Sequence, residues 1–159
     1  WLTKLVLAPS CYGHFTVDHN RGHHREVSTA NDHTSARMGE NIYAFAVREL
    51  PGAFIRGWQL EKELLARKGQ SVWSWRNSIL QTLAITSTLW GAMVAWLGWR
   101  ALPWVLASSF WANFQLTSAN YIEHYGLGRR KLPNGKYEAC EPRHSWNSDF
   151  IISNYALLH

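Results

Sequence analysis

No charged side chain occurs in NSILQTLAITSTLWGAMVAWLGW, residues 77–99, or, after Arg100, in ALPWVLASSFWANFQLTSANYI, residues 101–122. A helix needs about 20 mostly apolar residues to cross the hydrocarbon core of a membrane, so each run is long enough. Gly98 and Pro103 flank a connection that is short enough only for a tight hairpin, and Pro is tolerated in the first turn of a helix. The two runs therefore predict membrane crossings at about 78–99 and 102–122.

Tryptophans near the ends of the two runs support this interpretation. Interfacial aromatic residues belong at the boundary between lipid and water, which is the position expected for Trp73, Trp75, Trp99 and Trp104. Both runs also contain Ser, Thr, Asn and Gln, which leaves open a second interpretation as two buried core helices of a soluble protein.

Basic residues on both sides of the hairpin predict its orientation. The short connection has only Arg100, so the positive-inside tendency places the flanking segments 18–76 and 123–159 in the cytoplasm. The basic residues before the hairpin are Arg56, Lys62, Arg67, Lys68 and Arg76, and those after it are Arg129, Arg130, Lys131, Lys136 and Arg143.

The composition favours a protein at a membrane over a soluble enzyme. The 159 residues include ten Trp and 16 Lys and Arg against 11 Asp and Glu. Nucleic-acid binding is not expected, because the basic residues lie beside predicted crossings. Cys11 and Cys140 lack metal-type spacing and are expected to be free thiols. A chain that runs from Trp1 to His159 is expected to be an internal piece of a longer protein.

The segment before the first crossing is predicted to contain two helical pieces. Thr34 or Ser35 is expected to cap the first, and Pro51–Gly52 to break it. The pieces could lie on the membrane surface or be solvated helices packed on a core, and both possibilities stay open. Helical spacing is carried by Met38, Ile42 and Phe45 in the first piece and by Phe54, Ile55, Trp58 and Leu65 in the second.

A histidine cluster occurs in VDHNRGHH, residues 17–24. On an α-helix His19 and His23 project from one face, while His24 is displaced by about 100° from His23. Two of these imidazoles can hold one metal ion, and the third can turn toward a neighbouring one. Gly22 allows another element to approach closely. A structural or incidental role of the cluster remains open at this point.

His124, in NYIEHYG just past the second run, is expected near the cytoplasmic interface, where the first cluster can also reach. All-imidazole ligation suits iron, copper or zinc and argues against magnesium or calcium. Asp18 and Glu123 each precede a histidine and are expected to orient a ligand histidine from another helix. Four histidines are too few for a pair of metal ions. The histidines without ligand spacing are His14, His33, His144 and His159.

Four motifs resemble those of membrane-bound alkane 1-monooxygenases, the non-haem di-iron alkane hydroxylases. They are HNRGHH (19–24), SARMGE (35–40), NYIEHYGL (120–127) and HSWNS (144–148), and the resemblance covers essentially all 159 residues. The third motif separates these hydroxylases from desaturases that share the histidine boxes. The resemblance implies an all-α integral membrane helical bundle with a fatty-acid-desaturase-like histidine-box fold, of which residues 1–159 form part of a single domain.

The same resemblance implies two iron ions. Its ligands in this chain are His19, His23 and His24, as the second histidine box, and His124, as the signature histidine. The first box is expected upstream of Trp1 and the third just beyond His159. The family usually has Glu where this sequence has Asp18, so a shorter carboxylate would have to make the same contact.

The resemblance further implies terminal hydroxylation of medium-chain n-alkanes to 1-alkanols with O2 and electrons from rubredoxin, supplied by rubredoxin reductase, in the bacterial inner membrane with the active site on the cytoplasmic side. The alternatives are a related hydroxylase or desaturase acting on xylene or fatty-acyl substrates, and a non-catalytic metal-binding membrane protein. Candidates for an apolar substrate channel are Trp90, Trp96, Phe110, Trp111 and Phe114. Candidates for rubredoxin docking, or for lipid contact, are Arg129, Arg130, Lys131, Lys136 and Arg143.

Overall fold

The computed structural model describes residues 2–146, and its regular structure there is helical apart from one isolated antiparallel bridge between Lys131 and Tyr137. The predicted all-α class is therefore confirmed for these residues. Residues 15–26, which we call the histidine segment, comprise α2 (Phe15–Asp18), the π-helix η1 (His19–His23) and α3 (His24–Glu26). The other elements are α1 (Leu2–Leu7), α4 (Ile42–Arg67), α5 (Ser78–Leu97), α6 (Ala101–Glu123) and the 3-10 helix η2 (Pro142–His144).

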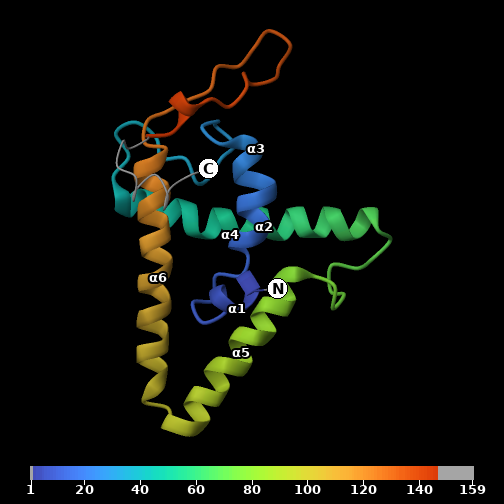
Figure 1. The fold of residues 1–159 in the computed structure, drawn as a ribbon, viewed down its shortest axis with the longest axis vertical. Helices are drawn as coiled ribbons and strands as arrows, with labels where there is room; N and C mark the ends of the chain where they lie inside the picture. Colours follow the sequence, from blue (N-terminus) through green and yellow to red (C-terminus); the bar gives the residue numbers. More distant parts are fainter. Residues whose placement is uncertain (1, 147–159) are drawn as a thin grey trace.

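The two uncharged runs form α5 and α6, joined by a short turn and diverging from it like the arms of a V (Figure 1). Asn77 caps α5 by accepting hydrogen bonds from the backbone of Ile79 and Leu80. Gly98 ends the helix with φ +79°, a left-handed conformation that glycine adopts without strain. The predicted helical hairpin is thus present, with Pro103 in the first turn of α6.

Within residues 2–146, α5 is the single helix that is long and apolar enough to cross a bilayer. Its mean hydropathy is 1.3 and 17% of it is buried in this chain, so it is not a core helix of the described residues. α6 has a suitable length but falls short of the same criterion. The crossing predicted at 102–122 therefore stays a prediction.

Polar side chains inside the hairpin bind the turn that follows α1. Thr86 Oγ1 donates to a carbonyl at 2.7 Å, Trp90 Nε1 at 3.0 Å and Asn113 Nδ2 at 2.8 Å. Their acceptors are the three consecutive carbonyls of residues 8–10. These polar residues therefore hold an upstream segment between α5 and α6, which accounts for their presence in otherwise apolar runs.

The predicted break at Pro51–Gly52 is wrong, because α4 continues through both residues from Ile42 to Arg67. Pro51 removes one backbone hydrogen bond, but the helix is held on both sides of it by tertiary contacts. Gly52 packs against the His33 ring so closely that a Cβ there would lie 2.7 Å from Cγ of His33. Tertiary packing thus overrides the local helix-breaking tendency.

The predicted cap of this helix is also wrong. Asn41, rather than Thr34 or Ser35, precedes the first turn, and its Oδ1 accepts from the backbone of Tyr43 at 3.1 Å and Ala44 at 2.9 Å. Met38 lies before the helix and is 74% exposed. The hydroxyls of Thr34 and Ser35 are used at the histidine segment instead.

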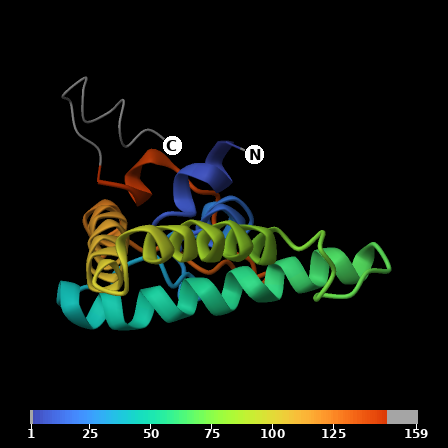
Figure 2. The same ribbon diagram turned by 90° about the horizontal axis from the view of Figure 1, so that it is seen from below.

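The buried face of α4 carries three charged residues, Glu49, Arg56 and Glu61, which are 0%, 8% and 1% exposed. Glu49 accepts from Thr117 Oγ1 at 2.7 Å and from Asn120 Nδ2 at 3.1 Å, both on α6. α4 lies across the ends of α5 and α6 that are remote from their connecting turn (Figures 1 and 2). A buried carboxylate with several donors therefore joins α4 to α6.

We predict that Glu49→Ala lowers the free energy of unfolding by about 1–3 kcal/mol, because Thr117, Asn120 and Tyr12 would lose a buried acceptor. Denaturation of the purified full-length protein in mixed micelles measures this. Glu63→Ala on the same helix is the matched control: its side chain is 63% exposed, so a change within about 0.5 kcal/mol is expected. Equal losses in both variants would contradict the role given to Glu49.

Candidate metal centre

The structure brings the four predicted ligand histidines together. The ring centroids of His23 and His124 lie 4.9 Å apart, although the two residues come from different ends of the chain. The ring centroid of His19 lies 5.3 Å from that of His23 and 4.5 Å from that of His24. The histidine segment and the end of α6 therefore share one site, on the same side of the molecule, as the orientation argument requires.

The local geometry of the cluster differs from the α-helical expectation. Residues 19–23 form a π-helical turn, in which the backbone N–H of His24 donates to the carbonyl of His19, five residues earlier. This extra residue per turn brings the His24 ring closer to His19 than the His23 ring is. All three imidazoles are thus packed into one cluster, and π-helical turns are frequent at functional sites.

Hydrogen bonds assign the tautomers of the two buried histidines. Nδ1 of His23 donates to Asp32 Oδ2 at 2.9 Å, and Nδ1 of His124 donates to the carbonyl of His144 at 3.1 Å. In both rings the lone pair is then on Nε2. A carboxylate or carbonyl behind Nδ1 is the usual partner of a metal-binding histidine, so these residues fit an imidazole-ligated transition metal.

The four histidines do not by themselves complete a site. Within residues 2–146 no group of three or more His, Cys, Asp or Glu side chains has the arrangement that a metal ion needs.

Asp32, which belongs to no sequence motif selected above, is the carboxylate that is hydrogen-bonded to His23. Its side chain is completely buried and also accepts from Ser35 Oγ at 2.6 Å and Thr34 Oγ1 at 2.7 Å. Burial alone would raise the pKa of Asp32, but the hydrogen bonds from His23, Ser35 and Thr34 hold it below its ordinary value. Asp32 therefore stays ionised beside the ligand.

The two acids selected from the sequence lie elsewhere in the site. Asp18 Oδ1 is 3.4 Å from Arg56 Nε, and burial raises the pKa of Asp18 to about 7 although Arg56 opposes this. Glu123 Oε1 lies 3.8 Å from Nε2 of its own neighbour, His124. Of the carboxylates near the box, Asp32 is therefore more fully ionised at neutral pH than Asp18.

His144 supports the site through its backbone. Its carbonyl accepts from Ser28 Oγ at 2.9 Å as well as from His124, and its side chain is 3.3 Å from Glu138 Oε1. His14 is buried against Phe54, and His33 is half-buried against Gly52. These histidines were predicted to be hydrogen-bonded or exposed, and the His144 ring is hydrogen-bonded as predicted. His14 does not fit the prediction, because it is buried and its Nε2 has no hydrogen-bond partner in the described structure. His159 lies outside the described residues.

The candidate docking residues are not equivalent. Arg129 donates to the carbonyls of Arg25, Val27 and Glu138, so its guanidinium ties the chain after the histidine box to the loop after α6. Arg130 and Arg143 both pair with Glu138, while Lys131 and Lys136 are exposed. Docking stays a prediction, and Arg129 has in addition a structural role.

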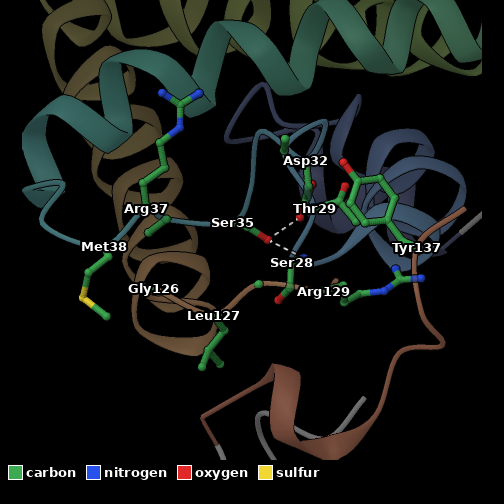
Figure 3. Close-up of a pocket in the computed structure, with 13 residues that line it drawn as sticks. Ser28, Thr29, Asp32, Ser35, Arg37, Met38, Gly126, Leu127, Arg129 and Tyr137 are labelled. Carbon is green, nitrogen blue, oxygen red and sulfur yellow. Dashed lines mark hydrogen bonds between the residues drawn. The ribbon is translucent and has the colours of Figure 1, made fainter. Parts of the chain in front are cut away.

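A pocket of about 390 Å³ with a mixed polar and apolar lining adjoins the site (Figure 3). Ser35 Oγ lies there between Asp32 and the backbone N–H of Ser28, which donates to it at 2.8 Å. Apolar side chains such as Met38 and Leu127 line the pocket together with these polar groups. The other lining residues include Thr29, Arg37, Met38, Gly126, Leu127, Arg129 and Tyr137.

Three of the five candidate channel residues are largely exposed in the described structure. Trp96, Phe110 and Trp111 are 84%, 62% and 60% exposed. Phe114 stacks on Phe110 with centroids 6.1 Å apart, and Trp90 is half-buried and bonded to the turn at residues 8–10. Their role in a channel stays a prediction.

Comparison with known proteins shows the family to which this chain belongs. The fatty acid desaturase family matches the chain over residues 1–159. The chain belongs to the fatty acid desaturase family. Within curated proteins, it is 52% identical over all 159 residues to an alkane 1-monooxygenase of Ectopseudomonas oleovorans and 53% identical over the same length to alkane 1-monooxygenase 1 of Alcanivorax borkumensis. The resemblance drawn from the four motifs is thereby confirmed.

This member of the fatty acid desaturase family spans 40% and 39% of the length of those two relatives. A more distant relative, the xylene/toluene monooxygenase hydroxylase component of Pseudomonas putida, is 35% identical over 114 residues, which are 71% of this chain and 31% of that protein.

We predict that Asp32→Asn lowers the metal affinity of the full-length protein by about 10–100-fold, because the amide keeps the shape but removes the charge behind His23. Metal content after dialysis against graded chelator measures the affinity. Glu40→Gln is the control, since Glu40 is ion-paired with Arg48 at 2.8 Å and touches none of the four histidines. Unchanged affinity in the Asp32 variant would contradict the orienting role.

Proposed function

We propose that the protein containing this chain is a membrane-bound, non-haem di-iron alkane 1-monooxygenase that converts medium-chain n-alkanes to 1-alkanols with O2 and electrons from rubredoxin. The observation that carries this proposal is the 52% identity to an alkane 1-monooxygenase over every residue of the chain, combined with the convergence of His19, His23, His24 and His124. We place it in the bacterial inner membrane with the site on the cytoplasmic side.

In this proposal His19, His23, His24 and His124 contribute part of the ligand set for iron. When bound, iron supplies the activation of O2, which no side chain of this protein can perform. Asp32 and the His144 carbonyl fix the tautomers of His23 and His124, so that each presents Nε2. The buried surroundings of these two rings, each 2% exposed, keep bulk water away from His23 and His124, whereas His24 is exposed.

Substrate and electron donor would approach this centre from different sides. An alkane offers no polar handle, so it must be selected by the shape of an apolar channel reached from the lipid. Rubredoxin would approach from the cytoplasm, where exposed Lys131 and Lys136 attract an acidic partner.

A second candidate is hydroxylation of an aromatic methyl group, favoured by the 35% identity to the xylene/toluene monooxygenase component. Both reactions insert oxygen into a C–H bond of a methyl group, so the same centre could serve either. The identity is lower and extends over less of the chain than the identity to the alkane enzymes, which favours the alkane reaction.

We predict that His124→Ala abolishes hydroxylation of octane while the protein remains in the membrane fraction, because the variant loses an imidazole ligand. Product formation is followed by gas chromatography, and iron content by elemental analysis of the purified protein. His33→Ala serves as the control, since that ring lies outside the cluster and should leave iron content unchanged. Full activity in the His124 variant would refute its assignment as a ligand.

The substrate class is tested on the purified full-length enzyme with rubredoxin and its reductase. We expect 1-octanol from octane at a higher kcat/KM than methyl hydroxylation of xylene or modification of a fatty-acyl substrate. The protein should contain two iron ions per chain. A preference for xylene would favour the second candidate, and zinc or no metal would favour a non-catalytic membrane protein.

A further inference from the structure

Arg56 of α4 is the cation that faces the histidine segment, and neither the motifs nor the ligand set includes it. Its side chain is 10% exposed, and its guanidinium contacts three carboxylates. Nε lies 3.4 Å from Asp18, Nη2 lies 3.3 Å from Glu26, and Nη1 lies 3.2 Å from Asp32. Asp18 directly precedes the histidine box and Glu26 follows it by two residues, so one arginine forms ion pairs at both ends of the box.

Gly22 lets this guanidinium lie against the backbone of the box itself. A Cβ at position 22 would be 2.5 Å from Nε and 2.8 Å from Cζ of Arg56, closer than side chains tolerate. The glycine that the sequence marked as a point of close approach is therefore approached by Arg56. Any side chain there would have to displace the arginine from its three carboxylates.

Asp32 connects Arg56 to a ligand. Its Oδ1 faces Arg56 Nη1, and its Oδ2 accepts from Nδ1 of His23 at 2.9 Å. The two interactions share one buried carboxylate, so moving the guanidinium changes both the position and the effective charge of the group behind His23. Outer partners of this kind orient a ligand ring and raise its basicity.

An ordinary structural ion pair would explain fewer of these contacts. A buried guanidinium has five N–H donors and needs several acceptors, but a purely structural arginine need not take them from one particular segment. All three carboxylates of Arg56 lie within residues 18–32, around or behind the histidines. Arg48 on the same helix shows the ordinary case, because it pairs with Glu40 and with the carbonyls of His33 and Ser35.

We propose that Arg56 is a positioning residue of the metal centre: through Asp32 it sets the orientation and donor strength of His23, and through Asp18 and Glu26 it fixes both ends of the histidine box. The inference rests on the proposed function, since it assumes that the histidines bind metal. It adds an arginine from outside every histidine motif to the machinery of that site.

The first test compares Arg56→Met and Arg56→Lys with the wild type in the full-length protein. Apoprotein is titrated with Co²⁺, whose visible absorption reports ligand geometry. We expect Arg56→Met to bind Co²⁺ about 10–100-fold more weakly and with a changed spectrum. Arg56→Lys keeps the charge but loses the planar fork, so partial rescue of affinity is expected.

The second test uses Gly22→Ala, which displaces the guanidinium without removing it. We expect the Co²⁺ spectrum of this variant to change in the same direction as that of Arg56→Met. In the double variant the effects should not add, because the methyl group has no guanidinium left to displace. Additive losses would show that the two residues act independently and would overturn the inference.

Arg48→Met is the matched control, since it removes a second partly buried arginine from α4 that touches none of the three carboxylates. It should lower thermal stability and leave Co²⁺ affinity and spectrum unchanged. An unchanged titration in Arg56→Met, or an equal change in Arg48→Met, would overturn the inference while leaving the proposed function intact. A wild-type protein that bound neither Co²⁺ nor iron would instead overturn the proposed function.

Discussion

Removing a charge from water costs several kcal/mol unless a partner is in place. α4 buries three charged side chains, those of Glu49, Arg56 and Glu61. Glu49 is satisfied by α6, and Arg56 by the carboxylates around the histidine segment. Glu61 accepts from the backbone N–H of Ser78 at 2.7 Å and pairs with Arg21 at 3.0 Å, which fixes the start of α5. The rotation of α4 about its axis must therefore satisfy three buried charges at the same time. Their partners lie on α6, around the histidine segment and at the start of α5, so these contacts position those elements against α4.

This constraint matters most for the histidines. His19 and His23 lie on an element of five residues and His24 on one of three, and both elements are far too short to be stable alone. The geometry of the histidines is set by residues outside these short elements: Arg56 beside the box, Asp32 bonded to His23, and the His144 carbonyl bonded to His124. The π-helical turn, which would be a weak element in isolation, is held in place by these neighbours. Precise placement of the imidazoles is thus a property of tertiary contacts.

The same distinction explains what could be predicted. The helical hairpin followed from two long uncharged runs, and the meeting of His124 with the box followed from the orientation that basic residues imply. The continuation of α4 through Pro51 could not be predicted, because Gly52 and its partners stabilise it from a distance. Asp32 was missed because ANDHTSAR has the composition of an ordinary loop, and only the folded chain places its carboxylate behind His23. Local sequence patterns thus predicted the helices and the ligand histidines, whereas the residues that support the site could not be predicted, because their role depends on contacts between distant segments.

The hydrogen bonds between the helical hairpin and the turn after α1 have a consequence for biogenesis in a bilayer. Thr86, Trp90 and Asn113 donate to carbonyls of residues 8–10, which precede the hairpin along the chain. If the hairpin entered lipid alone, Trp90 would face hydrocarbon without this acceptor, at a cost in free energy, whereas Thr86 and Asn113 could still donate to Thr82 and Ser109 of their own helices. In a membrane-inserted protein, synthesis from the amino end would deliver residues 8–10 to the translocon first. The order of the chain would thus let the later helices enter beside the carbonyls of residues 8–10, which are synthesised before them.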